Sequence, residues 1–356
     1  MRALIFKDKR NIFSLAYGAL RWYINYFLTR NPLPLACDLY ITSKCNLKCS
    51  FCNIWRKQSH AILPLSEARG IIDNLSNLGC FYLSISGGEP LLVDYIFDLL
   101  LYVRGSKIKY IHMVTNGYLL DSSIAKRLKE TGINEVSISI DGRRQFHDEK
   151  RGAGDSYDRA VEAVENIKEY APNTKIVLNT ILWPREPFEC LHVIELARLF
   201  EVYVKVQPLN QHPIFDTDNS SVISSGGISQ AEIKEVVTRL RKEKRVVNSG
   251  LFLENIYNFF FEKKNLIFRD SPCIFGYHHI EISENGRVFP CLEGMNWQNG
   301  LDYKGDLMSL LRSSIYKRLL EKLKLCKGCQ RNYYICYYEP RINFPIVNFL
   351  KSVFCI

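Results

Sequence analysis

The stretch DLYITSKCNLKCSFC, residues 38–52, places three cysteines directly after a short β-rich run. Residues 38–42 contain aromatic and β-branched side chains, which favour a strand. Cys45, Cys49 and Cys52 follow with the spacing C-x3-C-x2-C. Three thiolates on one short loop are able to hold three corners of an iron–sulfur cubane, which normally has four cysteine ligands. A zinc site completed by a distant ligand and a loop without metal are the alternatives.

This β-rich run is the first of six that alternate with helical patterns. The expected strands are residues 38–42, 81–86, 110–114, 135–140, 175–182 and 202–206. The helical patterns between them cover residues 66–78, 91–104, 122–131, 155–170 and 188–200. Consecutive βα units form a mainly parallel sheet with right-handed crossovers. Since no dinucleotide glycine fingerprint is present, the six units favour a partial (β/α)6 TIM-like barrel over a doubly wound sheet.

The character of the chain changes after the sixth strand. A polar stretch leads to a capping box at residues 229–232, which opens a charged helix. Asn285-Gly286 then predicts a hairpin between residues 279–283 and 288–290, inside a small C-terminal α+β domain. The expected units are a basic aromatic N-terminal segment at 1–36, the barrel at 37–248, a linking helix at 249–272 and a cluster-binding domain at 273–356.

Composition excludes several classes of protein. With 356 residues, 47% hydrophobic and 24% charged, the chain is neither disordered nor fibrous. Its 12 cysteines are clustered and too sparse for a small disulfide scaffold, and no signal-peptide cleavage site is apparent. We therefore expect a cytoplasmic protein with reduced thiols.

The net charge of +10 comes from two segments, residues 1–36 and 315–331. The long middle is near neutral, so no nucleic-acid partner is expected. In the first segment the basic residues border many aromatic and aliphatic ones, a composition typical of a helix in a membrane interface. Peripheral membrane contact is one interpretation, and a helix packed on the protein's own barrel with solvated Lys and Arg is the other.

A second motif, Ser86-Gly87-Gly88-Glu89-Pro90, follows the second expected strand, and Phe51 gives the cysteine motif the form C-x3-C-x-aromatic-C. With both motifs at consecutive strand ends, the chain resembles the radical S-adenosylmethionine (SAM) superfamily. That resemblance implies a [4Fe–4S] cluster whose open iron binds the amino and carboxylate groups of SAM. It also implies reductive cleavage of SAM to a 5′-deoxyadenosyl radical, and an external one-electron donor such as flavodoxin or ferredoxin.

The same resemblance implies a set of cofactor-binding residues at strand ends and beside the third cysteine. Gly87 and Gly88 would approach the methionine amino group, with Glu89 near that cation. The sequence Ser139-Ile140-Asp141-Gly142, followed by His147 to Gly152, resembles a pattern in which Ser139 and Arg151 bind the SAM ribose or carboxylate. The full candidate set is Phe51, Gly87, Gly88, Glu89, Asn116, Ser139, Arg151 and Gln207. The plain alternatives are an ordinary Asn-Gly turn at Asn116 and a surface arginine at 151.

A second cysteine set lies near the C-terminus, in the pattern C-x12-G-x4-C followed by C-x2-C. It resembles the SPASM/Twitch extension of the superfamily and implies an auxiliary [4Fe–4S] cluster on four residues, Cys273, Cys291, Cys326 and Cys329. A structural zinc site is the alternative, and Cys336 and Cys355 are further candidate ligands. The remaining cysteines are expected to be packed small hydrophobic residues, namely Cys37, Cys80 and Cys190.

The resemblance implies hydrogen abstraction but does not identify the substrate. Oxidation of a small molecule such as a sugar alcohol or nucleoside, and chemistry on a lipid-linked substrate, are the favoured classes. Maturation of a ribosomal peptide or protein is the alternative enzymatic class. The non-enzymatic alternative is an iron–sulfur electron carrier, which has no use for an open iron.

Overall fold

A computed structural model describes residues 9–57, 60–210, 227–261, 273–291, 300–324, 326, 333 and 334. In chain order the elements are α2 (Lys9–Thr29), β1 (Ala36–Thr42), η1 (Ile54–Arg56), α3 (Leu65–Leu78), β2 (Tyr82–Gly87), η2 (Pro90–Leu92), α4 (Ile96–Arg104), β3 (Tyr110–Thr115), α5 (Ser122–Thr131), β4 (Glu135–Ser139), α6 (Arg144–Arg151), α7 (Ser156–Tyr170), β5 (Lys175–Leu182), α8 (Glu189–Leu199), β6 (Tyr203–Pro208), α10 (Gln230–Lys242), α11 (Gly250–Phe261), α12 (Phe275–His278), β7 (His279–Ile282), β8 (Arg287–Phe289), β9 (Leu301–Asp302), α13 (Leu307–Arg312) and α14 (Ser314–Lys324).

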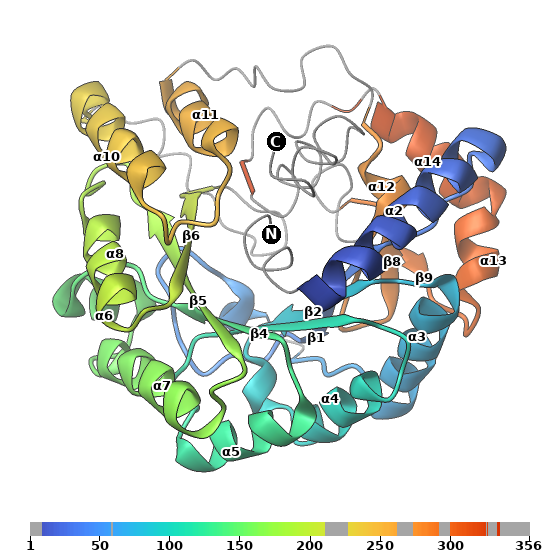
Figure 1. The fold of residues 1–356 in the computed structure, drawn as a ribbon, viewed down its shortest axis with the longest axis horizontal. Helices are drawn as coiled ribbons and strands as arrows, with labels where there is room; N and C mark the ends of the chain where they lie inside the picture. Colours follow the sequence, from blue (N-terminus) through green and yellow to red (C-terminus); the bar gives the residue numbers. More distant parts are fainter. Residues whose placement is uncertain are drawn as a thin grey trace.

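One nine-stranded sheet organises the molecule, in the order β6-β5-β4-β3-β2-β1-β7-β8-β9. The six strands β1 to β6 are parallel and pair with their sequence neighbours. They curve into an open barrel whose outer face is covered by helices α3 to α8 (Figure 1). The predicted partial (β/α)6 barrel is therefore confirmed, with strand ends shifted by one or two residues.

The predicted hairpin around Asn285-Gly286 is present as β7 and β8, which pair antiparallel. Gly286 adopts the left-handed φ of 67° that this turn requires, and its amide bonds the carbonyl of Ser283 at 3.0 Å. Strand β7 also pairs in parallel with β1, with Ala36 opposite His279. The sheet thus continues from the barrel into the C-terminal region.

Two helical segments differ from the sequence expectation. The single helix expected at 91–104 is instead the 3-10 turn η2 and the separate helix α4. The Glu89 carboxylate caps the turn at Leu91, and Val93 ends it in an extended conformation. Helix α6 was not expected at all, because its sequence RQFHDEKR lacks an apolar stripe. Of the linking helix expected at 249–272, the structure shows α11, and residues 262–272 lie outside the described part.

The concave face of the sheet carries buried polar side chains rather than a wholly apolar packing. His112 on β3 is central, with Nδ1 2.8 Å from the Tyr82 hydroxyl and 3.0 Å from the Ser84 hydroxyl. Its Nε2 lies 2.8 Å from the hydroxyl of Ser137 on β4. Burial lowers the pKa of His112 to about 4, and the nearby Lys205 ammonium group adds to this effect. His112 is therefore neutral in the folded chain near pH 7.

The depressed pKa of His112 predicts a loss of stability in acid. Between pH 6.5 and about 4, His112 is protonated in the unfolded chain and neutral in the folded chain. The free energy of unfolding therefore falls as the pH falls through this range. The loss of unfolding free energy caused by His112 amounts to about 1 kcal/mol between pH 7.5 and 5.5. The substitution His112→Gln removes it, so the urea midpoint of the variant should decline less over that range than the wild-type midpoint. Parallel declines in the two proteins would contradict the prediction.

Candidate active site

The loop that carries Cys45, Cys49 and Cys52, called the cysteine loop below, lies at the carboxyl end of β1. It borders a cavity of about 190 Å³. All three cysteines of the loop line this cavity, together with residues from the carboxyl ends of β2 to β6. In parallel barrels the active site is built at this end of the strands. The lining includes Cys45, Cys49, Phe51, Cys52, Gly87, Gly88, Asn116, Ser139, Arg151, Ile181, Gln207, Asn210 and Tyr334.

The end of β2 approaches the start of the cysteine loop so closely that only glycine fits. A Cβ on Gly88 would lie 1.9 Å from the carbonyl oxygen of Lys44, and one on Gly87 would lie 2.3 Å from that of Thr42. Gly87 also has a φ of 136°, which side chains disfavour. Two backbone hydrogen bonds join the segments, from Gly88 N to Thr42 O at 2.7 Å and from Glu89 N to Lys44 O at 2.8 Å. The glycine pair therefore fixes where the cysteine loop begins.

Glu89 is fully buried behind this glycine pair. Its carboxylate accepts hydrogen bonds from the Thr115 hydroxyl at 2.7 Å, the Asn116 amide at 2.8 Å and the Leu91 amide at 3.1 Å. Burial raises the pKa of Glu89 to about 7, although these hydrogen bonds partly offset the increase. The Asn116 side chain in turn donates to Asn46 Oδ1 at 2.8 Å. Glu89 and Asn116 thus connect β2 and β3 to the cysteine loop.

A buried ion pair lies on the other side of the loop. The Arg151 guanidinium donates to Asp141 through Nε at 2.7 Å, and its Nη2 is also 2.7 Å from that carboxylate. The guanidinium lies 5.0 Å from the centre of the Phe51 ring and hydrogen-bonds to Cys49. Burial would lower the pKa of Arg151, but Asp141 and Cys49 raise it above its ordinary value. Arg151 is therefore a fixed cation at the wall of the cavity, and not the surface arginine considered above.

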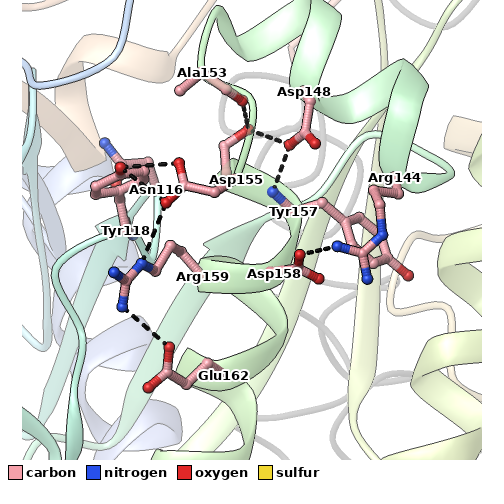
Figure 2. A network of polar contacts seen from close by, with 11 residues as sticks. Asn116, Tyr118, Arg144, Asp148, Ala153, Asp155, Tyr157, Asp158, Arg159 and Glu162 are labelled. Atoms are coloured by element: carbon pink, nitrogen blue, oxygen red, sulfur yellow. Dashed lines mark hydrogen bonds and ion pairs between the residues drawn. The ribbon is translucent and has the colours of Figure 1, made fainter.

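Helix α6 carries Arg151 to this position and is itself held by α7. The Asp148 carboxylate accepts hydrogen bonds from the hydroxyl of Ser156 and the amide of Tyr157, both at 2.8 Å (Figure 2). Near its C-terminal end α6 also contacts the cysteine loop, because the amide of Ser50 donates to the carbonyl of Lys150 at 2.9 Å. These contacts supply the stability that the polar sequence of α6 lacks.

The thiols of the loop are buried and therefore hard to ionise without a metal. Burial raises the pKa of Cys45 to about 11 and that of Cys52 to about 12. It also raises the pKa of Cys49, which Arg151 opposes. Within the described residues, no three His, Cys, Asp or Glu side chains are placed to hold a single metal ion. The three thiols line one cavity, and thiolates of cysteine are the ligands that iron–sulfur clusters take.

The structure brings all eight predicted cofactor-binding residues to this region. Seven of them line the cavity, and Glu89 lies buried behind the glycines. Three features of the site were not predicted from the sequence, namely the pairing of Asp141 with Arg151 and the places of Ile181 and Tyr334 in the cavity wall. Asn179 of β5 is not among the residues that line the cavity, and its buried Oδ1 has no hydrogen-bond partner within the described residues.

The second cysteine set is only partly described. Cys273 precedes α12, Cys291 follows β8 and Cys326 follows α14, while Cys329, Cys336 and Cys355 lie outside the described residues. The first two cysteine segments are neighbours, since a Cβ on Gly276 would touch Pro290 at 2.6 Å and Leu320 of α14 at 2.7 Å. The cysteines expected to be packed hydrophobic residues are buried, which confirms that interpretation for Cys37, Cys80 and Cys190.

Comparison with known families gives a match to the Radical SAM superfamily over residues 39–197. Among curated proteins, Fe-coproporphyrin III synthase of Methanosarcina barkeri is 35% identical over 36% of this chain, but the match covers only 33% of that protein. AdoMet-dependent heme synthase of the same organism is 25% identical, covering 74% of this chain and 78% of its own length. GTP 3′,8-cyclase of Clostridium perfringens is 25% identical, with 78% and 88% covered.

Among solved structures, SuiB of Streptococcus suis bound to S-adenosylmethionine is similar, with a TM-score of 0.64 and 16% sequence identity. The similarity covers 90% of this chain and 81% of SuiB. At this identity the likeness shows a shared fold, and it extends beyond the residues matched by the family.

Proposed function

We propose that this chain, whose residues 39–197 match the Radical SAM superfamily, cleaves SAM reductively and takes a hydrogen atom from an organic substrate. The observation that supports this most strongly is the convergence of three thiols, a close-packed glycine pair and a fixed arginine on one cavity. Radical SAM proteins bind SAM and a [4Fe–4S] cluster. When bound, the cluster supplies the electron that splits the sulfonium of SAM.

We assign Cys45, Cys49 and Cys52 as the ligands of this cluster. Arg151 stabilises the thiolate form of Cys49, since its positively charged guanidinium hydrogen-bonds to that sulfur. The ion pair with Asp141 keeps the guanidinium in this position. Because the thiols are otherwise protonated, assembly of the cluster would release protons from all three sulfurs. An external one-electron donor such as flavodoxin or ferredoxin would reduce it, in the cytoplasm where thiols stay reduced.

The residues at the carboxyl ends of the other strands are proposed to bind SAM. Gly87 and Gly88 line the cavity, so their backbone would lie against the methionine part of a bound SAM. Glu89, buried behind these glycines, would favour the methionine ammonium group through the negative charge of its carboxylate and without direct contact, since a nearby cation favours the ionised form of a carboxyl whose pKa is about 7. Ser139 and Gln207 offer a hydroxyl and an amide to the ribose or adenine, and both line the cavity.

For the second cysteine set we propose an auxiliary [4Fe–4S] cluster on four residues, Cys273, Cys291, Cys326 and Cys329. The packing of Gly276 against Pro290 and Leu320 supports this, because it brings the segments that carry Cys273 and Cys291 together beside α14.

We propose a small organic molecule as the substrate. The curated relatives aligned over most of the chain are named for heme synthesis and for cyclisation of GTP, both reactions of small molecules. Peptide maturation is the second candidate, because SuiB, which shares the fold, has also been solved with its precursor peptide SuiA.

The test is anaerobic incubation of the reconstituted protein with SAM and dithionite, followed by chromatography for 5′-deoxyadenosine. The proposed function predicts its formation, whereas an iron–sulfur electron carrier would form none. Adding small-molecule or peptide fractions of a cell extract then separates the two substrate classes. The fraction that contains the substrate should increase 5′-deoxyadenosine formation.

A further inference from the structure

Helix α2 packs one of its faces onto the protein. Trp22 is fully buried there, and its indole Nε1 donates to the carbonyl of Tyr277 at 3.0 Å. The Tyr26 ring meets the Tyr277 ring edge to face at 5.1 Å. Gly18 faces Leu35, which precedes β1. The helix is therefore a fixed part of the fold rather than a free terminal segment.

The opposite face of α2 is apolar and open to solvent. Five large side chains on it are 52–78% exposed, namely Tyr17, Leu20, Ile24, Phe27 and Leu28. Their spacing of three, four, three and one residues places them on one stripe of an α-helix. The helix therefore packs on the protein itself, as the second interpretation of this segment expected, but these outward positions carry apolar side chains in place of Lys and Arg. Apolar stripes of this size mark interaction surfaces.

Basic residues are concentrated in two segments of the sequence, the one that contains α2 and the one that contains α14. Residues 1–36 carry six Lys or Arg against Asp8 alone. Helix α14, which lies beside α2 in Figure 1, adds the exposed Lys317, Arg318 and Lys322. Lys324 of α14 hydrogen-bonds to Tyr277, whose ring also contacts Tyr26 of α2, so the two helices meet the same residue. Positive charge borders the stripe itself at Arg30, whose guanidinium carbon lies 5.7 Å from the centre of the Phe27 ring.

We propose that the α2 stripe binds the surface of an anionic lipid bilayer. Aromatic and aliphatic side chains flanked by cations are what an interfacial helix needs, since it inserts its apolar side below the headgroups and attracts their negative charge. None of the helices in the described ranges has the length and apolarity to cross a bilayer, so α2 lies on the surface. A second copy of this chain is a poor occupant, because pairing two such faces would bring like charges together.

The position of α2 also sets the orientation on the membrane. Its contacts are with Leu35, Leu78 and Tyr277, which precede β1, β2 and β7 at the amino ends of these parallel strands. The cysteine loop and its cavity lie beyond the carboxyl ends. A chain bound through α2 therefore holds the cavity away from the bilayer, where it meets substrates from the aqueous phase. This argues against a lipid-linked substrate.

Flotation of vesicles tests the proposal on the full-length, reconstituted protein. The vesicles contain phosphatidylcholine alone or phosphatidylcholine with phosphatidylglycerol. Wild-type protein should float only with the anionic vesicles. The triple substitution Leu20→Ser, Ile24→Ser and Leu28→Ser should lower the bound fraction on the order of tenfold or more. The matched control is Leu199→Ser with Leu101→Ser, which changes exposed leucines outside the stripe and should bind like wild type.

Three results would overturn the proposal: no flotation of wild-type protein with anionic vesicles, equal flotation of the triple variant, or a wild-type dimer that the triple variant dissociates. Formation of 5′-deoxyadenosine is measured in parallel. Because the stripe is far from the cavity, the variant should keep this activity, which shows that it is folded.

Discussion

Replacing Cys49 with Ala is expected to eliminate the formation of 5′-deoxyadenosine and most of the iron bound by the N-terminal site. Only two of the three thiolates would remain, and the Arg151 guanidinium would lose the sulfur that it contacts. Loss of a ligand should exceed the roughly 10–100-fold cost of losing an outer-shell partner. The measurements are iron and sulfide content and chromatography of the SAM reaction.

The matched control for this substitution is Cys190→Ala. Cys190 is also buried but lies in α8, where its thiol donates to the local carbonyl of Pro187. The control should lose some packing stability and keep both iron and activity. Full activity in Cys49→Ala, or equal loss in the control, would remove Cys49 from the cluster.

Replacing Gly88 with Ala is expected to disrupt the site as severely without touching any ligand. The new Cβ would collide with the backbone oxygen of Lys44, which is not free to rotate away. Either the end of β2 or the start of the cysteine loop must shift, and the hydrogen bonds from Gly88 and Glu89 to that loop would break. We expect SAM affinity to fall by more than about tenfold and the denaturation midpoint to fall as well, as strain at a buried backbone contact costs about 1–3 kcal/mol.

Gly154→Ala serves as the control, because a Cβ at Gly154 meets nothing within 4 Å. It should bind SAM like the wild-type protein in an equilibrium titration under anaerobic conditions. Normal SAM binding by Gly88→Ala would show that the loop tolerates the shift and that the close approach is not needed.

Local patterns allowed much of the architecture to be predicted. The six parallel strands are mostly apolar runs between clear helix signals, and each is found within two residues of its expected position. Local patterns failed where stability comes from elsewhere in the chain. Helix α6 is an example, because its polar sequence is held by Asp148 bonding to the start of α7 and by Lys150 bonding to Ser50.

The active site likewise combines groups that neighbour one another in the sequence with groups that only the fold brings together. The C-x3-C-x2-C spacing and the Gly87-Gly88-Glu89 run are contiguous, so the chain itself holds these groups together whatever the rest of the fold does. The tertiary structure decided that Arg151 is buried against Asp141 and Cys49, since residues 49 and 151 meet only when α6 packs on the cysteine loop. It also decided which face of α2 is covered. The helical periodicity of α2 shows two apolar faces, but only the packing of Trp22 against Tyr277 determines which of them remains exposed.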